Sequence, residues 1–394
     1  MFEKVEDYPV DPIMIGADYF AQDPRADKLN LTVGIYQDGD GNTPVLHAVK
    51  LAEQRLIETQ TSKSYLALTG DAEYCRALGH QILGMDIYDS LVAAQTAGGA
   101  VALRVMADLL AQIPDSPTVW LQTPTYGNYV PILIAAGARF QAVPYYDPIL
   151  REIMFEQMLD GLKEARTGDV FLMQGVCHNP TGADMKPAQF DALLNLLEKK
   201  GVVPWIDLAY LGFAQSFAAD CDMAHKIAAR FPECIICITL SKSFGIYRDR
   251  AGALFVKTNP QDRAHMQRAL SAIVRSGASH APDHGPSVVR TILEDASLKK
   301  LWLSELDQMR MRVTKVRKDI VATEARDFGR NDLGYLAYQS GMFSLLPLTV
   351  DQEKVLTQNH GIHIVKGGRI NVARLTANDI PHLIRAFHSA TSNS

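Results

Sequence analysis

The sequence has few cysteines, no long apolar run and no excess of basic residues, and each absence excludes a class of protein. Five cysteines among 394 residues are too sparse for a disulfide-rich secreted scaffold and suit a reducing compartment. No run approaches the roughly 20 apolar residues that span a bilayer. The formal net charge is -5, whereas a nucleic-acid surface needs a basic stripe. We therefore expect no membrane or nucleic-acid partner.

The N-terminal segment MFEKVEDYPVDP also lacks the basic start and apolar stretch of a secretory signal, so we expect a cytoplasmic protein. Hydrophobic residues make up 47% and charged residues 21% of the chain, which is typical of a globular enzyme. A chain of this length exceeds the size at which one core stops growing. We expect a large domain over 46–305 and a smaller unit formed by 1–45 and 306–394.

Short β-branched runs alternate with helical patterns in the middle of the chain: TVWLQTP, DVFLMQG, VVPWID, CIICITL and GALFVK. This alternation predicts an α/β fold with a mostly parallel sheet covered by helices on both faces. Beyond about residue 290 a long charged helical pattern is followed by short strands around MFSLLPL and GIHIVKGGRINVA. That change predicts a smaller α+β unit.

Cys234 and Cys237 form a CxxC pair inside CIICITL. Strand alternation points residues i and i+3 to opposite faces, and the sequence has no second pair to complete a metal site. We expect both cysteines to fill the core, and we predict no metal.

Lys242 follows the apolar run CIICITLS, with Ser241 and Ser243 on either side and Arg250 eight positions on. Ligands of parallel sheets lie beyond the carboxyl ends of strands. A partly desolvated lysine near positive charge loses its proton readily and becomes a nucleophile. Hydroxyls and a guanidinium also suit a phosphate. For this motif alone, a solvated loop lysine remains the alternative.

A glycine turn precedes an amphipathic helix at Gln95-Thr-Ala-Gly-Gly-Ala100. Glycines at a helix N-terminus leave backbone N–H groups free for a phosphate, although a plain helix start explains the same letters. Asp207 ends the apolar run VVPWI, where a carboxylate is costly unless it is paired. A protonated pyridine nitrogen is a suitable partner, and a helix-capping Asp is the alternative. Asn179 lies in an Asn-Pro turn and could donate to a phenolic oxygen.

The ordered set HNPTG, DLAYLGF, SKSFGIYRDRAG, GMFS and GRINVA closely resembles the class I aminotransferases of the aspartate and aromatic amino-acid subgroup. The resemblance covers essentially the whole chain. It implies pyridoxal 5'-phosphate as cofactor and fold type I of the pyridoxal-phosphate-dependent transferases, with the large and small domains described above.

The resemblance also implies roles for individual residues. Lys242 is the Schiff-base and proton-transfer residue, Asp207 is the partner of the pyridine nitrogen, and Tyr210 is the third catalytic residue. Asn179 and Tyr210 bind the phenolic oxygen, and Tyr126 takes the place of the tryptophan stacked over the cofactor. The residues expected around the phosphate are Gly98, Gly99, Ala100, Thr239, Ser241, Arg250 and, from the partner subunit, Tyr65.

Substrate recognition follows from the same resemblance. Arg369 matches the arginine that binds the α-carboxylate with a planar fork, which lysine replaces poorly. Arg275 matches the arginine that reaches across a dimer interface to a distal carboxylate. Gly34 is expected against the substrate, together with Tyr126 and Asn179. As an alternative, either arginine could form a surface ion pair worth under about 1 kcal/mol.

Several positions depart from the family pattern and bear on substrate choice. Besides Tyr126, they are Gly98 and Ala100 in the glycine turn, His280 in the stretch after Arg275, Gln37, Ser64 and Arg374. With Arg275 retained in an altered pocket, we expect transfer of the amino group of aromatic amino acids, and of aspartate, to 2-oxoglutarate. A strict aspartate aminotransferase is the first alternative, and a pyridoxal-phosphate β-lyase or a non-catalytic member is less favoured. A homodimer with shared active sites is expected.

Overall fold

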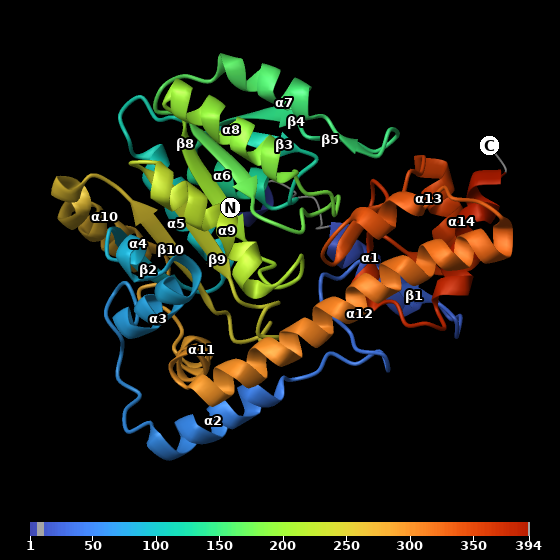
Figure 1. Ribbon diagram of the computed structural model, residues 1–394, viewed down its shortest axis with the longest axis horizontal. Coiled ribbons are helices and arrows are strands. Elements are labelled where there is room, and N and C mark those ends of the chain that lie inside the picture. The colour runs from blue at the N-terminus through green and yellow to red at the C-terminus, as the bar shows by residue number, and fades with distance from the viewer. Residues whose placement is uncertain (6–11, 393–394) are drawn as a thin grey trace.

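The computed structural model describes residues 1–5 and 12–392; residues 6–11 of the N-terminal segment and residues 393–394 lie outside the described part. The main feature is a seven-stranded sheet in the order β2-β10-β9-β8-β7-β3-β4 (Figure 1). Only β10 (Gly252–Lys257) runs antiparallel to its neighbours among these strands. The expectation of a mostly parallel α/β sheet is confirmed.

The five strands expected from the sequence all form, within two residues of their expected ends. The sheet also contains two strands that the sequence analysis did not identify, β2 and β4. Alanine and glutamine in LVAAQT carry little strand propensity, and β2 is defined by its pairing with β10. The bounds are β2 (Leu91–Thr96), β3 (Thr118–Thr123), β4 (Arg139–Pro144), β7 (Val170–Gln174), β8 (Val203–Leu208) and β9 (Cys234–Thr239).

Both faces of the sheet are buried under helices, and successive side chains of each strand point to opposite faces. In β9, Cys234 and Ile236 belong to one apolar cluster, whereas Ile235 and Cys237 belong to the other. The two cysteines are therefore buried on opposite faces, as their spacing predicts. The first face packs on α3 (Ala72–Leu83), α8 (Pro187–Lys200) and α9 (Phe217–Arg230). The second packs on α5 (Gly99–Ala111), α6 (Tyr129–Ala136) and α10 (Arg263–Gly277).

The long helix expected beyond residue 290 is α12 (Ala296–Phe328). It starts at Asp295, whose side chain accepts hydrogen bonds from two backbone N–H groups of the first turn. At its N-terminal end α12 contacts α2 (His47–Thr59) and α11 (His284–Glu294), and farther along it contacts α14 (Ile380–Ser392) (Figure 1). The expected division between 46–305 and 306–394 therefore falls inside one helix. We retain that division as a proposal in which α12 belongs to both domains.

Short strand pairs organise the C-terminal part and join it to the N-terminal residues. β1 (Leu29–Asn30) pairs in parallel with β12 (Ile362–His363), and β11 (Phe343–Leu345) pairs antiparallel with β13 (Arg369–Asn371). Two further helices complete this part, α1 (Pro12–Gln22) and α13 (Val350–His360).

The remaining elements are short: η1 (Phe2–Lys4), α4 (Met85–Tyr88), β5 (Tyr146–Asp147), β6 (Glu152–Ile153), α7 (Phe155–Gly161), η2 (Leu162–Glu164), η3 (Pro260–Asp262), η4 (Gly334–Tyr338) and η5 (Val372–Arg374). Among the described residues, no helix has the length and apolarity to cross a membrane.

Candidate active site

A pocket opens at the edge of the sheet where β2, β7, β8 and β9 have their carboxyl ends, with the start of β10 between β2 and β9. Every residue predicted to bind the cofactor lines it except Gly98 and Tyr65. The full lining is Gly99, Ala100, Leu103, Tyr126, Gln174, Asn179, Asp207, Ala209, Tyr210, Thr239, Ser241, Lys242 and Arg250. Because parallel strands bring their carboxyl ends to one edge, residues as far apart in sequence as Gly99 and Arg250 meet here.

Lys242 lies in the turn after β9, and its Nζ is 5.4 Å from the centre of the Tyr210 ring. Burial lowers the pKa of Lys242 to about 8; the Arg250 charge acts in the same direction, and the Asp207 carboxylate opposes it. An amine with that pKa is uncharged in a useful fraction of molecules near neutral pH. The geometry therefore favours Lys242 as a nucleophile over a solvated loop lysine.

The turn that carries Lys242 is anchored from the long helix α12. The indole nitrogen of Trp302 donates to the Ser243 carbonyl at 2.8 Å, and the ring of Phe244 stacks on Trp302 at 4.2 Å. The Ser243 hydroxyl donates to the Leu211 carbonyl at 2.7 Å. These buried contacts restrict the backbone on one side of the lysine, so its amine is presented from a fixed point.

Asp207 lies near the end of β8 and is buried. Its Oδ2 accepts a hydrogen bond from the Tyr129 hydroxyl at 2.8 Å, whereas its Oδ1 has no hydrogen-bond partner among the described residues. Burial raises the pKa of Asp207 to about 6, against the effects of Tyr129 and Lys242. An unpaired buried carboxylate oxygen is costly. A cationic N–H group in the pocket, such as a protonated pyridine nitrogen, could donate a hydrogen bond to Oδ1.

Asn179 connects the pocket to the neighbouring arginine. Its side-chain nitrogen donates to the Tyr210 hydroxyl at 3.3 Å, and its side-chain oxygen accepts from Nη1 of Arg369 at 3.5 Å. The Gln174 side chain holds the Asn179 backbone through two hydrogen bonds of 2.8 Å, one from the N–H and one to the carbonyl. Asn179 and Tyr210 thus lie where two donors could meet one phenolic oxygen.

The opposite end of the pocket is built for a small anion. Gly98 has φ +82°, and a Cβ on Gly99 would lie 1.9 Å from the Thr239 hydroxyl oxygen. Only glycine allows this close approach, and it leaves the backbone N–H groups at the start of α5 open. Arg250 reaches the Ser241 hydroxyl at 3.4 Å and the Ala97 carbonyl at 3.3 Å. Hydroxyls, N–H groups and a guanidinium together fit a phosphate.

Arg369 lies on β13, at the other side of Asn179. Its Nη2 donates to the Thr32 carbonyl at 2.5 Å, and its guanidinium carbon is 4.7 Å from the centre of the Phe343 ring. A Cβ on Gly34 would lie 3.0 Å from the same ring. Arg369 also lines a cleft of about 1100 Å³ that shares Tyr126 and Asn179 with the first pocket. The two binding regions are therefore continuous.

Tyr65 and Arg275 are not brought to the pocket of their own chain. Tyr65 is 86% exposed, and Arg275 is exposed in the last turn of α10. The ring of His280 stacks on Tyr65 at 4.7 Å, and its Nδ1 lies 3.0 Å from the Leu66 carbonyl oxygen. Their expected roles depend on a second subunit and stay predictions.

Sequence reasoning missed four residues that shape the site: Tyr129, Gln174, Thr32 and Phe343. Gln174 could have been found, because it ends the strand run FLMQG just as Asp207 ends VVPWI. The only sequence signal for Tyr129 was weak: it lies three positions after Tyr126, at the start of a helix. Thr32 and Phe343 were not singled out, because their contacts with Arg369 are made only in the folded chain, and Thr32 lies 337 positions from Arg369 in sequence.

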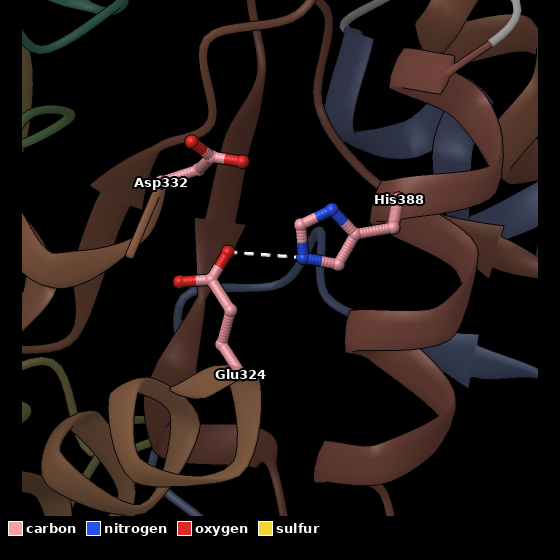
Figure 2. A group of neighbouring side chains, drawn as sticks. All are labelled: Glu324, Asp332 and His388. Atoms are coloured by element: carbon pink, nitrogen blue, oxygen red, sulfur yellow. Dashed lines mark ion pairs between the residues drawn. The ribbon is translucent and has the colours of Figure 1, made fainter. Parts of the chain in front are cut away.

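A second cluster of polar side chains lies apart from this site, in the C-terminal part. Glu324, Asp332 and His388 place one donor atom each within 4.8 Å of one another, a spacing that could hold a metal ion (Figure 2). However, Glu324 and His388 pair with each other at 3.0 Å, and Asp332 pairs with Arg330 at 2.7 Å. Because each side chain already has an oppositely charged or polar partner, we assign no metal to this cluster.

Comparisons with known proteins identify the family of this chain. The family model of aminotransferases class I and II matches residues 26–387. The chain belongs to this family.

Relatives cover this aminotransferase from end to end. Tyrosine aminotransferase of Rhizobium meliloti strain 1021 is 37% identical and covers 99% of this chain and 100% of its own. Aspartate aminotransferase of Escherichia coli K12 is 38% identical and covers 98% of this chain and 99% of its own. A solved aromatic-amino-acid aminotransferase from Burkholderia pseudomallei, covalently bound to pyridoxal phosphate, has a TM-score of 0.95, with 32% identity and 99% of each chain covered. The fold prediction is confirmed.

Proposed function

We propose that this aminotransferase uses pyridoxal 5'-phosphate to move the amino group of an aromatic amino acid, and also of aspartate, to 2-oxoglutarate, giving the oxo acid and L-glutamate. The observation that carries the proposal is the pocket itself. One end holds a buried amine and an unpaired carboxylate oxygen, and the other holds an anion cradle, as pyridoxal phosphate requires. The relatives named above are aminotransferases of tyrosine, aspartate and aromatic amino acids.

The residues of this chain divide the work between them. Lys242 would hold the cofactor through Nζ and, as a free amine, would move a proton between the substrate's α-carbon and the C4′ carbon of the cofactor. Its lowered pKa suits both tasks, because the uncharged amine is the form that attacks and accepts protons. Asp207 Oδ1 would bind the ring nitrogen, while Asn179 and Tyr210 would bind the phenolic oxygen. The phosphate would be held by Gly98, Gly99, Ala100, Thr239, Ser241 and Arg250.

Pyridoxal phosphate, when bound, supplies the electron sink that makes the substrate's α-carbon acidic. Arg369 binds the substrate's α-carboxylate and so sets the direction of the Cα–H bond toward Lys242. The Asn179 side chain is hydrogen-bonded to both Arg369 and Tyr210, so hydrogen bonds connect the group that positions the substrate to the groups that position the cofactor. Gly34 leaves room for the substrate beside Phe343.

The cleft beside Arg369 supports an aromatic substrate. It is lined largely by apolar and proline side chains, including Pro144, Met154 and Leu345, and by the ring of Tyr146. A cleft with about 1100 Å³ of space is far larger than an aspartate side chain needs. Apolar walls stabilise a ring by about 25 cal/mol for each Å² removed from water.

We further propose a homodimer with shared active sites and a reducing, cytoplasmic location. The dimer is supported by Tyr65, a large aromatic side chain that is 86% exposed in the single chain. Arg275 is exposed as well, at the end of a helix. All five cysteines are free and buried, which suits a compartment that keeps thiols reduced.

The test is a panel of amino donors with 2-oxoglutarate as acceptor. We expect phenylalanine, tyrosine, tryptophan and aspartate all to yield glutamate. Near-zero turnover of the aromatic donors would leave a strict aspartate aminotransferase. Pyruvate and ammonia released without any acceptor would indicate a β-lyase. Borohydride treatment of the yellow protein should label the peptide that contains Lys242, and an unlabelled peptide would reject the proposal as a whole.

A further inference from the structure

Tyr129 lies beside the candidate site, and the proposed function gives it no role. It begins α6, is 1% exposed, and its hydroxyl lies 2.8 Å from Oδ2 of Asp207, 78 positions away in sequence. Its ring meets that of Tyr126 edge-on, with centres 5.4 Å apart and planes at 88°. Tyr126 lines the pocket, so Tyr129 lies directly behind the pocket wall.

The two oxygens of Asp207 differ in a way that only Tyr129 explains among the described residues. Oδ2 accepts the phenolic hydrogen bond, whereas Oδ1 accepts none. A terminal carboxylate rotates easily about its last torsion. A single strong bond to one oxygen stops that rotation, and charge-assisted bonds of this kind are the strong ones in a dry site. The Tyr129 bond therefore decides where Oδ1 points.

We propose that Tyr129 is a positioning residue that directs Oδ1 of Asp207 at the ring nitrogen of pyridoxal phosphate and keeps the shared proton on that nitrogen. The inference rests on the proposed function. A donor to Asp207 stabilises its ionised form, so the carboxylate competes less well for the proton between it and the ring. Burial raises the pKa of Tyr129 well above its ordinary value, so its hydroxyl stays protonated and donates.

The decisive variant is Tyr129→Phe, which removes one oxygen and keeps the buried ring. The full-length enzyme is loaded with pyridoxal phosphate labelled with ¹⁵N in the ring. We expect the ¹⁵N resonance to move toward that of an unprotonated pyridine, and the dissociation constant of the cofactor to rise about tenfold. Tyr145→Phe is the matched control, because Tyr145 is also buried but its hydroxyl donates to the Ala183 carbonyl at 2.7 Å. It should leave both quantities unchanged.

A purely structural role for Tyr129 is tested with Asp207→Ala. If the hydroxyl acts through Asp207, adding Tyr129→Phe to Asp207→Ala lowers cofactor affinity no further. An equal loss in both backgrounds, or a wild-type resonance in Tyr129→Phe, would overturn the proposal.

Should Tyr129→Phe fold poorly, 3-fluorotyrosine at position 129 provides a stronger donor with nearly the same shape. The resonance should then stay at, or move toward, that of the fully protonated ring, and a shift toward the unprotonated ring counts against the proposal. Wild-type protein that binds no pyridoxal phosphate would instead reject the proposed function.

Discussion

The pocket at the sheet edge and the exposed surface that carries Tyr65 and Arg275 differ in how their residues are held. Lys242 and Asp207 are buried, and hydrogen bonds and packing from several elements surround them. Tyr65 is 86% exposed and rests mainly against His280. One chain therefore places the residues around Lys242 and Asp207 by itself, whereas the roles expected of Tyr65 at the phosphate and of Arg275 at a distal substrate group require a second chain.

Lys242→Ala tests the buried pocket and has the largest expected effect. Without the amine no group at this position can carry the proton, so kcat should fall by roughly a thousandfold or more. Steady-state assays with phenylalanine and with aspartate measure it. Lys226→Ala is the control, since Lys226 is an exposed lysine paired with Asp191. Substantial turnover by Lys242→Ala would show that another group does the chemistry.

Arg369→Lys tests the buried arginine of the substrate cleft and should lower activity with both classes of amino donor. Lysine keeps the charge but loses the planar fork, so kcat/KM should fall about a hundredfold for phenylalanine and aspartate alike. Arg230→Lys, at the exposed pair with Glu198, should change kcat/KM less than twofold. A loss confined to aspartate would mean that Arg369 reads the distal carboxylate instead.

Arg275→Ala tests the exposed region and should separate the donors. We expect kcat/KM for aspartate to fall about tenfold, because one charge-assisted contact is lost, and kcat/KM for phenylalanine to change little. Mixed dimers of Lys242→Ala and Arg275→Ala chains should regain aspartate turnover, because one of their two sites is then intact. Hybrids no more active than their parents would exclude shared sites.

The pH dependence of the reactivity of the Lys242 amine tests the electrostatics of the buried pocket. Burial lowers its pKa to about 8, so its reaction with an amine reagent in the cofactor-free protein should rise through pH 8, below the value of about 10.4 for free lysine. Asp207→Asn should move the midpoint lower still, because the carboxylate favours the charged amine. Peptide mass spectrometry across pH measures both midpoints. An upward shift in Asp207→Asn would contradict the assigned electrostatics.

Trp302→Phe should have the smallest effect. The ring can still stack on Phe244, but the hydrogen bond to the Ser243 carbonyl is lost. We expect the free energy of unfolding to fall by about 1 kcal/mol, measured by chemical denaturation. Met311→Ala, at an exposed position of the same helix, should stay within about 0.5 kcal/mol of wild type. An unchanged Trp302→Phe would show that the turn at Lys242 needs no anchor from α12.

Much of the sheet and of the pocket could be predicted from local patterns. Lys242 and Asn179 follow strands and Asp207 lies near the end of one, and strand ends converge in a parallel sheet, so their proximity was predictable. The strand β2 was missed, because LVAAQT is a weak strand sequence that depends on its partner β10. The domain boundary was expected at residue 305, although α12 runs through it without interruption.

The order of motifs along the chain was enough to determine the α/β fold, the family, and the lysine, carboxylate and glycine turn of one pocket. Only the tertiary structure decided which oxygen of Asp207 is paired, that Trp302 anchors the lysine turn, and that Asn179 touches Arg369. Strand ends and turns are encoded by neighbouring residues, whereas these contacts join segments far apart in sequence. Their partners are selected by packing, which no short stretch of sequence specifies.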